Sequence, residues 1–291
     1  MLGSISFIMS SPKTVLITGC SNGGIGSALA ITFQERGYHV FATARDPSKM
    51  RSLEGLSRVT LLTLDVVKPS DIQAAVEAVT KHTGGTLDCL VSNAGRNHFM
   101  PILDEDLEGT RRLFEINFLG PIALTQAFAP FLMKAKGTAV YITSTSGYVN
   151  IPYMGTYAAS KRSLEIVADT LRLELAPFDV NVIEVVTGAV KSQGQTYFDD
   201  FKLPEQSLYK GIESIVAGRA QGKDGTQRMD TGEYAAAVVD EVMKGTAGRI
   251  WFGGRAEDVR LGTTATAVPQ SAMDAGMAMG TGLDAVGKFA S

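Results

Sequence analysis

The chain has 291 residues, of which 45% are hydrophobic and 20% are charged, and its formal net charge is −3. A chain of this size and balance can bury one large core, and it offers no basic surface for nucleic acid. Its two cysteines, Cys20 and Cys89, are too few for a disulfide framework, so we interpret both as small buried residues in a reducing compartment.

The first twelve residues contain a short apolar run, from Ile5 to Met9, without a basic start. This pattern predicts neither a signal peptide nor a membrane span, and we interpret residues 1–12 as an N-terminal extension. No stretch approaches the ~20 apolar residues that a spanning helix requires. We therefore expect a cytoplasmic protein without firm membrane association.

A glycine-rich turn follows the first predicted strand, which covers residues 14–19. It opens an amphipathic helix with apolar residues at positions 25, 28, 29 and 33. Glycines let the backbone approach a pyrophosphate closely, and a helix N-terminus offers free N–H groups and the positive end of its dipole. Glycine clusters also form ordinary tight turns. The position between a strand and a helix favours a phosphate-binding turn here.

The second predicted strand, over 38–44, ends at Arg45. An acidic residue there would bind the ribose hydroxyls of NAD, whereas a basic residue would accommodate the 2′-phosphate of NADP. Arg45 could also be a solvated residue at a strand end. No carboxylate precedes it in the strand, so we predict NADP. Asp46 is expected to cap a helix beginning at Pro47, and an inward-turned Asp46 would weaken the NADP preference.

Strand-like and helix-like segments alternate along the remaining chain. Ile72, Ala75, Val76 and Val79, for example, have the spacing of a helix that packs on a sheet. Apolar runs without alternation are typical of parallel strands covered on both faces. Further strands are predicted over 59–64, 87–92, 138–143, 180–186 and 249–252. The fold class is therefore α/β, a Rossmann-type doubly wound parallel sheet of about seven strands, in a single domain over residues 13–260.

Tyr157 and Lys161 are four residues apart, and Ser144 lies thirteen residues before the tyrosine. Residues at this spacing lie one above the other on a helix, so the ammonium is expected to favour ionisation of the phenol. A tyrosine pKa near ~10 would thereby move toward neutrality. Alone, the pair could be a surface contact. Together with the upstream motifs it predicts acid/base catalysis on a carbonyl.

Taken in order, these motifs resemble the short-chain dehydrogenase/reductase family over most of the chain. Within that family the sequence is most similar to the fungal-type NADPH-dependent 1-acyldihydroxyacetone phosphate reductases, through Gly19 to Gly26, Ala42 to Arg45 and Gly248 to Trp251. The family motifs are Thr18-Gly19, Gly23-Gly24-Ile25-Gly26, Asp65-Val66, Asn93-Ala94-Gly95, Asn117-x-x-Gly120, Ser144, Tyr157 and Lys161.

The resemblance implies a catalytic role for four residues. Ser144 would bind the carbonyl oxygen, which gains charge as hydride arrives, and Tyr157 would supply the proton. Lys161 would lower the pKa of the phenol and hold the nicotinamide ribose. Asn117 would anchor a water that links the lysine to solvent. Ser146 is a rival for Ser144, but the spacing to Tyr157 favours Ser144.

The resemblance also implies an NADPH site. Asp65 would contact the adenine amino group, while Asn93 could either support the ribose or cap its strand. Thr187 and Ser192 stand where the family usually has proline and threonine. The expected cofactor-binding residues are Gly19, Ser21, Asn22, Gly24, Ile25, Gly26, Arg45, Asp65, Val66, Asn93, Ala94, Gly95, Tyr157, Lys161, Gly188, Val190 and Ser192.

Residues 193–230 are expected to form a small helical substrate lid, because loops on a rigid scaffold usually carry specificity. Its apolar residues favour a hydrophobic or ring-containing substrate, but they could simply seal the lid. The lid residues considered are Tyr197, Phe198, Leu203, Leu208 and Tyr209, and the opposite wall is expected from Tyr148, Val149, Ile151 and Tyr153.

Other site chemistries are disfavoured. The three histidines, His39, His82 and His98, lie in no hydrolase motif and have no metal-ligand spacing, so no metal site is expected. His98 alone falls near the expected substrate mouth. The C-terminal tail, 261–291, contains Met273, Met277 and Met279 among small residues that bury little area. Firm membrane docking is therefore not expected.

The sequence thus predicts an NADPH-dependent ketoreductase. Its substrate would be either a secondary-metabolite ketone or a compound like acyldihydroxyacetone phosphate. The reverse reaction with NAD, an NADP-binding sensor and a non-redox isomerase or cyclase are alternatives on the same scaffold. The family resemblance further implies a homodimer or homotetramer that pairs through the helix carrying Tyr157 and the helix before it.

Overall fold

The computed structural model describes residues 11–264, 272, 276 and 279–282. Residues 1–10 of the expected extension, and Met273 and Met277 of the tail, lie outside the described residues. Seven strands pair in parallel in the order β3-β2-β1-β4-β5-β6-β7. Their bounds are β1 Thr14–Thr18, β2 His39–Ala44, β3 Val59–Thr63, β4 Cys89–Ser92, β5 Thr138–Ile142, β6 Asn181–Thr187 and β7 Gly248–Phe252. The predicted parallel sheet of seven strands is confirmed.

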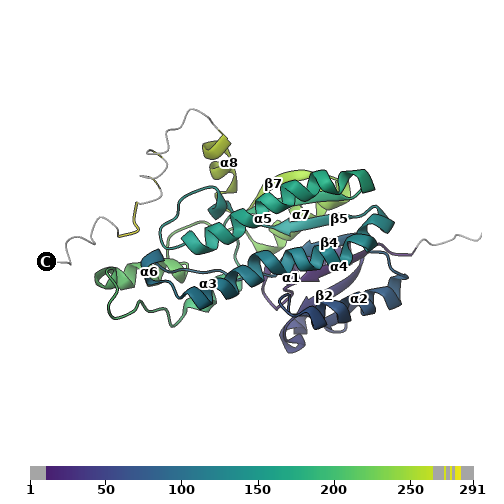
Figure 1. The fold of residues 1–291 in the computed structure, drawn as a ribbon, viewed down its shortest axis with the longest axis horizontal. Coiled ribbons are helices and arrows are strands. Elements are labelled where there is room, and N and C mark those ends of the chain that lie inside the picture. Colours follow the sequence, from purple (N-terminus) through teal and green to yellow (C-terminus); the bar gives the residue numbers. More distant parts are fainter. Residues whose placement is uncertain (1–10, 265–271, 273–275, 277–278, 283–291) are drawn as a thin grey trace, which may run out of the picture.

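Helices cover both faces of this sheet (Figure 1). One side carries α1 and α7, which pack together, and the other carries α2, α4 and α5. The helices are α1 Ile25–Glu35, α2 Pro69–Thr83, α3 Leu107–Phe114, α4 Gly120–Ala135, α5 Gly155–Glu174, α6 Glu213–Ala220, α7 Thr231–Lys244 and α8 Ala256–Thr264. Short turns of helix are η1 Pro47–Leu53, η2 Ile102–Asp104, η3 Glu115–Leu119, η4 Thr145–Gly147, η5 Ala176–Phe178, η6 Gln193–Phe198 and η7 Lys210–Ile212.

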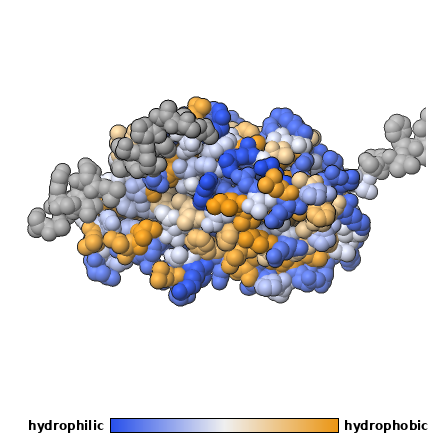
Figure 2. Space-filling model, turned by 45° about the horizontal axis from the view of Figure 1, so that its top comes forward, coloured by the Kyte–Doolittle hydropathy of each residue, from blue (hydrophilic) through white to orange (hydrophobic). Residues whose placement is uncertain are grey.

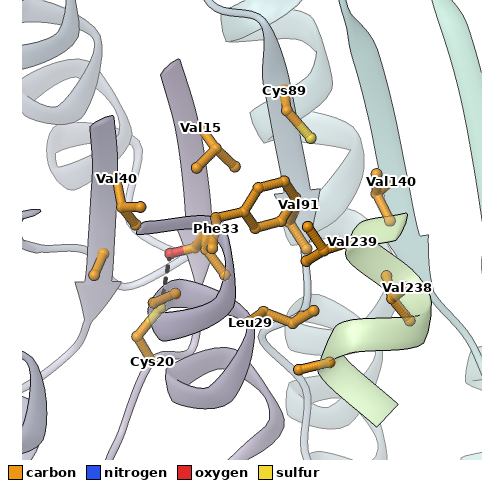
Figure 3. Packing of buried hydrophobic residues seen from close by; sticks show 14 of the residues in the cluster. Val15, Cys20, Leu29, Phe33, Val40, Cys89, Val91, Val140, Val238 and Val239 are labelled. Carbon is orange, nitrogen blue, oxygen red and sulfur yellow. Dashed lines mark hydrogen bonds between the residues drawn. The ribbon is translucent and has the colours of Figure 1, made fainter. Parts of the chain in front are cut away.

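Both cysteines lie in the core on the α1 and α7 side of the sheet, as Figure 3 shows. Cys20 Sγ donates a hydrogen bond to the Ile17 carbonyl oxygen at 3.3 Å. Burial raises the pKa of Cys20 to about 12 and raises the pKa of Cys89 as well. Both thiols are therefore kept protonated, and the interpretation of the cysteines as buried packing residues is confirmed.

From the sequence we expected no segment long and apolar enough to span a membrane, but the helical run from Leu107 to Ala135 is one. Its 29 residues are long and apolar enough to cross a membrane by length and composition. Leu124, Phe128 and Leu132 of this run are completely buried in the core beside α2 and the sheet. The apolar side of the helix is therefore already used in covering the sheet, as is common for core helices.

The sheet order reverses between β1 and β4, which is where ligands bind in doubly wound sheets. A smaller apolar cluster packs against α6, which lies near α3 at one end of the molecule (Figure 1). Tyr153 donates a hydrogen bond from its hydroxyl to the Thr281 carbonyl oxygen at 2.8 Å. This bond ties the described part of the tail to the substrate end of the fold. The buried members of the cluster are Phe99, Tyr153, Phe198, Leu203, Ile212, Val216 and Ala220.

Large apolar side chains also remain on the surface. Figure 2 shows orange apolar groups among blue hydrophilic residues on the face it displays. The described residues with the most exposed apolar side chains include Leu208 in the predicted lid and Leu173 on α5. Of the expected lid residues, Leu208 faces solvent, whereas Phe198 and Leu203 are buried.

Candidate active site

A cavity of about 770 Å³ lies at the carboxyl ends of the central strands. This volume is within the range of small-molecule and cofactor sites. Two of the predicted site residues, Gly26 and Asn117, do not line it. The predicted residues that do line it are Gly19, Ser21, Asn22, Gly24, Ile25, Arg45, Asp65, Val66, Asn93, Ala94, Gly95, Ser144, Tyr157, Lys161, Gly188, Val190 and Ser192.

The glycine turn brings β1 and α1 into close contact. Gly19 has a φ of +75°, in the left-handed region that glycine adopts without a steric penalty. A Cβ atom on Gly26 would lie 2.4 Å from the Gly19 carbonyl oxygen and 2.6 Å from Asn93 Nδ2. Gly26 therefore shapes the turn from behind, and for this reason it does not line the cavity.

Asn93 holds the ends of β1 and β4 together. Its Nδ2 donates to the Thr18 carbonyl oxygen at 2.8 Å and to the Gly19 carbonyl oxygen at 3.2 Å. Thr18 Oγ1 in turn accepts the backbone N–H groups of Asn93 and Ala94. The side chain therefore caps the strand end, which is one of the two roles that the sequence allowed for Asn93. The residue also borders the cavity.

Arg45 lines the cavity, whereas Asp46 turns away from it. Asp46 Oδ1 accepts the Ser48 N–H at 3.0 Å and caps η1, and hydrogen bonds from Ser48 lower the pKa of the carboxyl. Among the described residues, Arg45 has no carboxylate partner. The glycine turn and this unpaired guanidinium together fit a dinucleotide with an additional phosphate.

Ser144 lies two residues after the end of β5 and caps η4. Its Oγ accepts a hydrogen bond from Ser146 Oγ at 2.9 Å and another from the Ser146 N–H at 3.2 Å. Ser146 is buried, whereas Ser144 is only half-buried. The two serines therefore have different environments, and the buried Ser146 holds the Ser144 hydroxyl in place by hydrogen bonding to it.

Tyr157 and Lys161 occupy the first two turns of α5. Burial raises the pKa of Tyr157, and a hydrogen bond with Ser144 partly opposes this shift. Lys161 Nζ donates to the Ile142 carbonyl oxygen at 2.8 Å, and burial lowers its pKa to about 8. The expectation that the ammonium lowers the phenol pKa therefore differs from the structure, where desolvation has the larger effect on both groups.

Asn117 lies behind the cavity in η3, a π-helical turn between α3 and α4. Its Nδ2 donates to the Arg96 carbonyl oxygen and to Ser160 Oγ, both at 3.0 Å, and its Oδ1 accepts the Arg96 N–H at 2.8 Å. A Cβ atom on Gly95 would lie 3.3 Å from Lys161 Nζ and 3.4 Å from Asn117 Oδ1. The amide is thus close to the lysine, and π-helical turns of this kind are frequent at functional sites.

Comparisons with known proteins agree with this geometry. The family model described as short chain dehydrogenase matches residues 13–202. The chain belongs to the short-chain dehydrogenase family.

Relatives cover most of this short-chain dehydrogenase. Short-chain dehydrogenase PC-15 of Penicillium crustosum is 47% identical over 241 residues, which are 83% of this chain and 88% of that protein. The NADPH-dependent 1-acyldihydroxyacetone phosphate reductase of Schizosaccharomyces pombe is 40% identical over 212 residues, 72% of this chain and 71% of that protein. The resemblance drawn from the sequence is therefore confirmed, and this chain is an oxidoreductase acting on CH–OH or C=O groups.

A solved structure agrees as well. A short-chain dehydrogenase from Streptomyces avermitilis superposes with a TM-score of 0.76 and 27% identity, covering 97% of this chain and 99% of that one. The Rossmann-type fold of this short-chain dehydrogenase is therefore common to both proteins.

The substrate wall differs in part from the expectation. Val149 and Ile151 line the cavity, but Tyr148 and Tyr153 do not. The Tyr148 ring lies 4.7 Å from the Trp251 ring, and Tyr153 packs in the apolar cluster below the lid. Both rings gain more from packing against aromatic neighbours than from facing an open cavity.

Two buried carboxylates, Glu165 and Glu184, pair with two partly exposed arginines behind Ser144, and no sequence pattern indicated these contacts. Arg162 Nη1 donates to Glu165 Oε2 at 3.0 Å, and Arg249 Nε donates to Glu184 Oε2 at 2.9 Å. The hydroxyl of Tyr148 donates to Glu184 Oε1 at 3.3 Å. These contacts join α5, β6 and β7, which are distant in sequence, so no local spacing could have indicated them.

His98 and Glu105 form a second contact that the sequence did not indicate. His98 Nε2 lies 2.7 Å from Glu105 Oε2, and Thr156 Oγ1 donates to Glu105 Oε1. His98 does not line the cavity. The pair therefore links the loop after β4 to Thr156, the residue that precedes Tyr157. It can help to position Tyr157, but the His98 side chain does not border the cavity.

Proposed function

We propose that this short-chain dehydrogenase is an NADPH-dependent ketoreductase that acts on a hydrophobic small molecule. The observation that carries the proposal is the convergence of Ser144, Tyr157 and Lys161 on the cavity that begins at the glycine turn and Arg45. One end of the cavity fits a phosphorylated dinucleotide, and the other holds an acid and a hydrogen-bond donor for a carbonyl oxygen.

Each catalytic residue has a defined task in this reaction. The bound cofactor supplies the hydride that reaches the carbonyl carbon. Ser144 donates a hydrogen bond to the carbonyl oxygen as its charge grows, and Tyr157 gives that oxygen its phenolic proton. Lys161 would hold the nicotinamide ribose. One hydride and one proton are thus added across the C=O bond to give an alcohol.

The protonation state of Tyr157 at neutral pH is the one that reduction requires. A raised phenol pKa keeps the side chain protonated at neutral pH, and the protonated form is the one that reduction consumes. An alcohol dehydrogenase would need the phenolate instead. A sensor that only binds NADP would have no use for an acid positioned beside Ser144.

The substrate and cofactor preferences rest on the cavity wall and on the relatives. Phe99, Val149, Ile151 and Met154 give the wall an apolar surface. The unpaired Arg45 supports NADPH, and the relative from Schizosaccharomyces pombe is named as NADPH-dependent. Several relatives are fungal short-chain dehydrogenases, which supports a ketone from secondary metabolism as the substrate. The second candidate is an acyldihydroxyacetone phosphate-like ketone, because the 40% identical relative is named for that substrate.

Location and assembly complete the proposal. We place the protein in the cytoplasm, without firm membrane association, and as a homodimer or homotetramer. The exposed Ile166 and Leu173 lie seven residues apart on α5, so they share one face of the helix and could be covered by a second copy. Light scattering at several protein concentrations would test the assembly, and a monomer throughout would contradict it.

The proposed function is tested by titrating the purified protein with NADPH and NADH while recording cofactor fluorescence. A panel of ketones is then added and the loss of NADPH absorbance is followed. Tighter NADPH binding and ketone-dependent oxidation are expected. Tight NADPH binding without oxidation by any ketone would favour the sensor or the non-redox enzyme.

A further inference from the structure

The substrate end of the cavity contains two guanidinium groups that the proposed mechanism does not use. Arg96 follows the Asn93-Ala94-Gly95 motif, and Arg219 lies on α6 in the predicted lid. Both residues line the same cavity as Ser144 and Tyr157. In the part of the chain that the structure describes, neither has a carboxylate within salt-bridge distance.

Arg219 is only partly satisfied by the protein. Its Nη1 reaches the Gly280 carbonyl oxygen at 3.5 Å, the outer limit of a hydrogen bond. Its Nε is buried and has no hydrogen-bond partner among the described residues. Buried donors are nearly always paired, because an unpaired one loses its hydration without compensation. The Nε group is therefore available for an acceptor that the protein itself does not supply.

The surroundings of Arg219 add an apolar body to this charged group. Phe99, Ile151, Met154 and Tyr197 line the same cavity, and Phe99 and Met154 pack in one apolar cluster with Val216 and Ala220, which flank Arg219 on α6. The Arg96 guanidinium lies 5.9 Å from the centre of the Tyr197 ring. Among the described residues, the carboxylates that line the cavity are Asp65, on the cofactor side, and Asp224, which pairs with Arg228 at 2.9 Å. The substrate end thus has an excess of positive charge beside an apolar wall.

We propose that the substrate is an anionic ketone, with a carboxylate or phosphate group that binds Arg219 and an apolar body that lies along the wall. Arg96, which lines the same cavity, adds a second positive charge. A guanidinium can bind two oxygens of a carboxylate or of a phosphate through two parallel hydrogen bonds. This inference rests on the proposed reductase function and narrows its substrate class.

The test compares charged ketones with neutral ones in the complete protein. Methyl-ketone carboxylic acids of several chain lengths are assayed with NADPH beside their methyl esters, and the matching keto-alkyl phosphates are assayed beside the acids. We expect the best anion to have a kcat/KM on the order of 10- to 100-fold above its neutral ester, from hydrogen bonds to charged groups. The larger gain, for the acid or the phosphate, identifies the anion.

The variant Arg219→Gln tests whether Arg219 causes the preference for the anionic ketone. The ratio of anion to ester kcat/KM should fall toward unity in it, whereas Arg260→Gln should keep the wild-type ratio. Arg260 lies on α8, pairs with Glu257 and does not line the cavity, so it controls for the loss of a positive charge. Equal rates for anion and ester in the wild type, an unchanged ratio in Arg219→Gln, or a loss of NADPH affinity as large as the loss of preference would overturn the inference.

A binding measurement separates this inference from the proposed function. Calorimetric titration of the NADP⁺ complex with a keto acid detects the anion without turnover. Binding that Arg219→Gln weakens, with no oxidation of NADPH by any ketone, would retain the anion site and contradict the reductase. Oxidation of NADPH by esters and acids alike would retain the reductase and contradict the anion site.

Discussion

The Glu165 carboxylate lies directly beneath Gly147, because a Cβ atom on Gly147 would be 2.7 Å from Glu165 Oε1. Gly147 ends the short turn η4, which Ser144 caps. Glu165 is completely buried, and its Oε1 has no hydrogen-bond partner among the described residues. A larger residue at position 147 would therefore push against a buried carboxylate and displace the turn that carries Ser144.

Ionisation of Glu165 should destabilise the folded protein. Burial raises the pKa of this carboxyl from 4.5 to about 7, although the hydrogen bond from Arg162 opposes the shift. The folded state therefore keeps the proton to a higher pH than the unfolded state does. The protonated carboxyl therefore contributes to the free energy of unfolding below pH 4.5, and this contribution, at most about 3 kcal/mol, is lost as the pH rises toward 7.

The variant Glu165→Gln removes this ionisation. Thermal unfolding of both proteins between pH 4.5 and 7 should show the Tm of the wild type falling relative to that of the variant as the pH rises. Glu54→Gln, at an exposed position, is the control and should follow the wild type. Parallel Tm curves for Glu165→Gln and the wild type would show that Glu165 does not titrate in this range.

Tyr157→Phe tests the proposed acid. Removing the phenolic oxygen leaves the ring and its packing but takes away the proton donor beside Ser144. We expect kcat to fall about 10²- to 10⁴-fold, the usual contribution of general acid catalysis, with NADPH affinity retained. Tyr38→Phe is the control, since Tyr38 is buried away from the cavity. Turnover near the wild-type level in Tyr157→Phe would exclude the phenol as the acid.

Arg45→Ala tests the cofactor preference. A guanidinium that binds the 2′-phosphate contributes to NADPH affinity and little to NADH affinity. The Kd for NADPH should therefore rise on the order of 10- to 100-fold while that for NADH changes little, from the strength of hydrogen bonds to charged groups. Fluorescence titration measures both constants. Arg51→Ala, at an exposed position in η1, is the control, and equal losses for both cofactors in Arg45→Ala would contradict a phosphate contact.

The sheet and the position of the site were predictable because each depends on local sequence. Strands buried on both faces appear as apolar runs, and their predicted ends agree with the observed ones within two residues. The motif residues follow strands whose carboxyl ends share one edge of the sheet, so their gathering around one cavity follows from the topology. Gly26 and Asn117 belong to the same motifs, but they pack behind the cavity wall.

Side-chain partners from distant segments were not predictable in this way. Thr187, which stands in place of the usual proline, shares a hydrogen bond of 2.6 Å with the buried hydroxyl of Tyr234 on α7. The acceptor of the Lys161 ammonium, the Ile142 carbonyl oxygen, had no signal in the sequence either. Both outcomes depend on which acceptor is nearest once the helices have packed on the sheet, and sequence spacing does not contain that information.

The loop after β4 should depend on Glu105 for its attachment to α5. Glu105 is nearly buried and accepts a hydrogen bond from Thr156, the residue before Tyr157, and it also contacts His98. Glu105→Ala would leave both partners without an acceptor, so we expect a loss of about 1–3 kcal/mol in the free energy of unfolding. Because the first turn of α5 would be less firmly held, kcat should fall more than NADPH affinity.

Urea unfolding and steady-state kinetics measure the two effects of Glu105→Ala. Glu108→Ala is the matched control, because Glu108 is exposed on α3 and pairs with the exposed Arg111; an exposed ion pair contributes ~0–1 kcal/mol. A wild-type unfolding free energy in Glu105→Ala would mean that the loop and the catalytic helix are held together by packing alone. A normal kcat with reduced stability would mean that the contact supports the fold without positioning Tyr157.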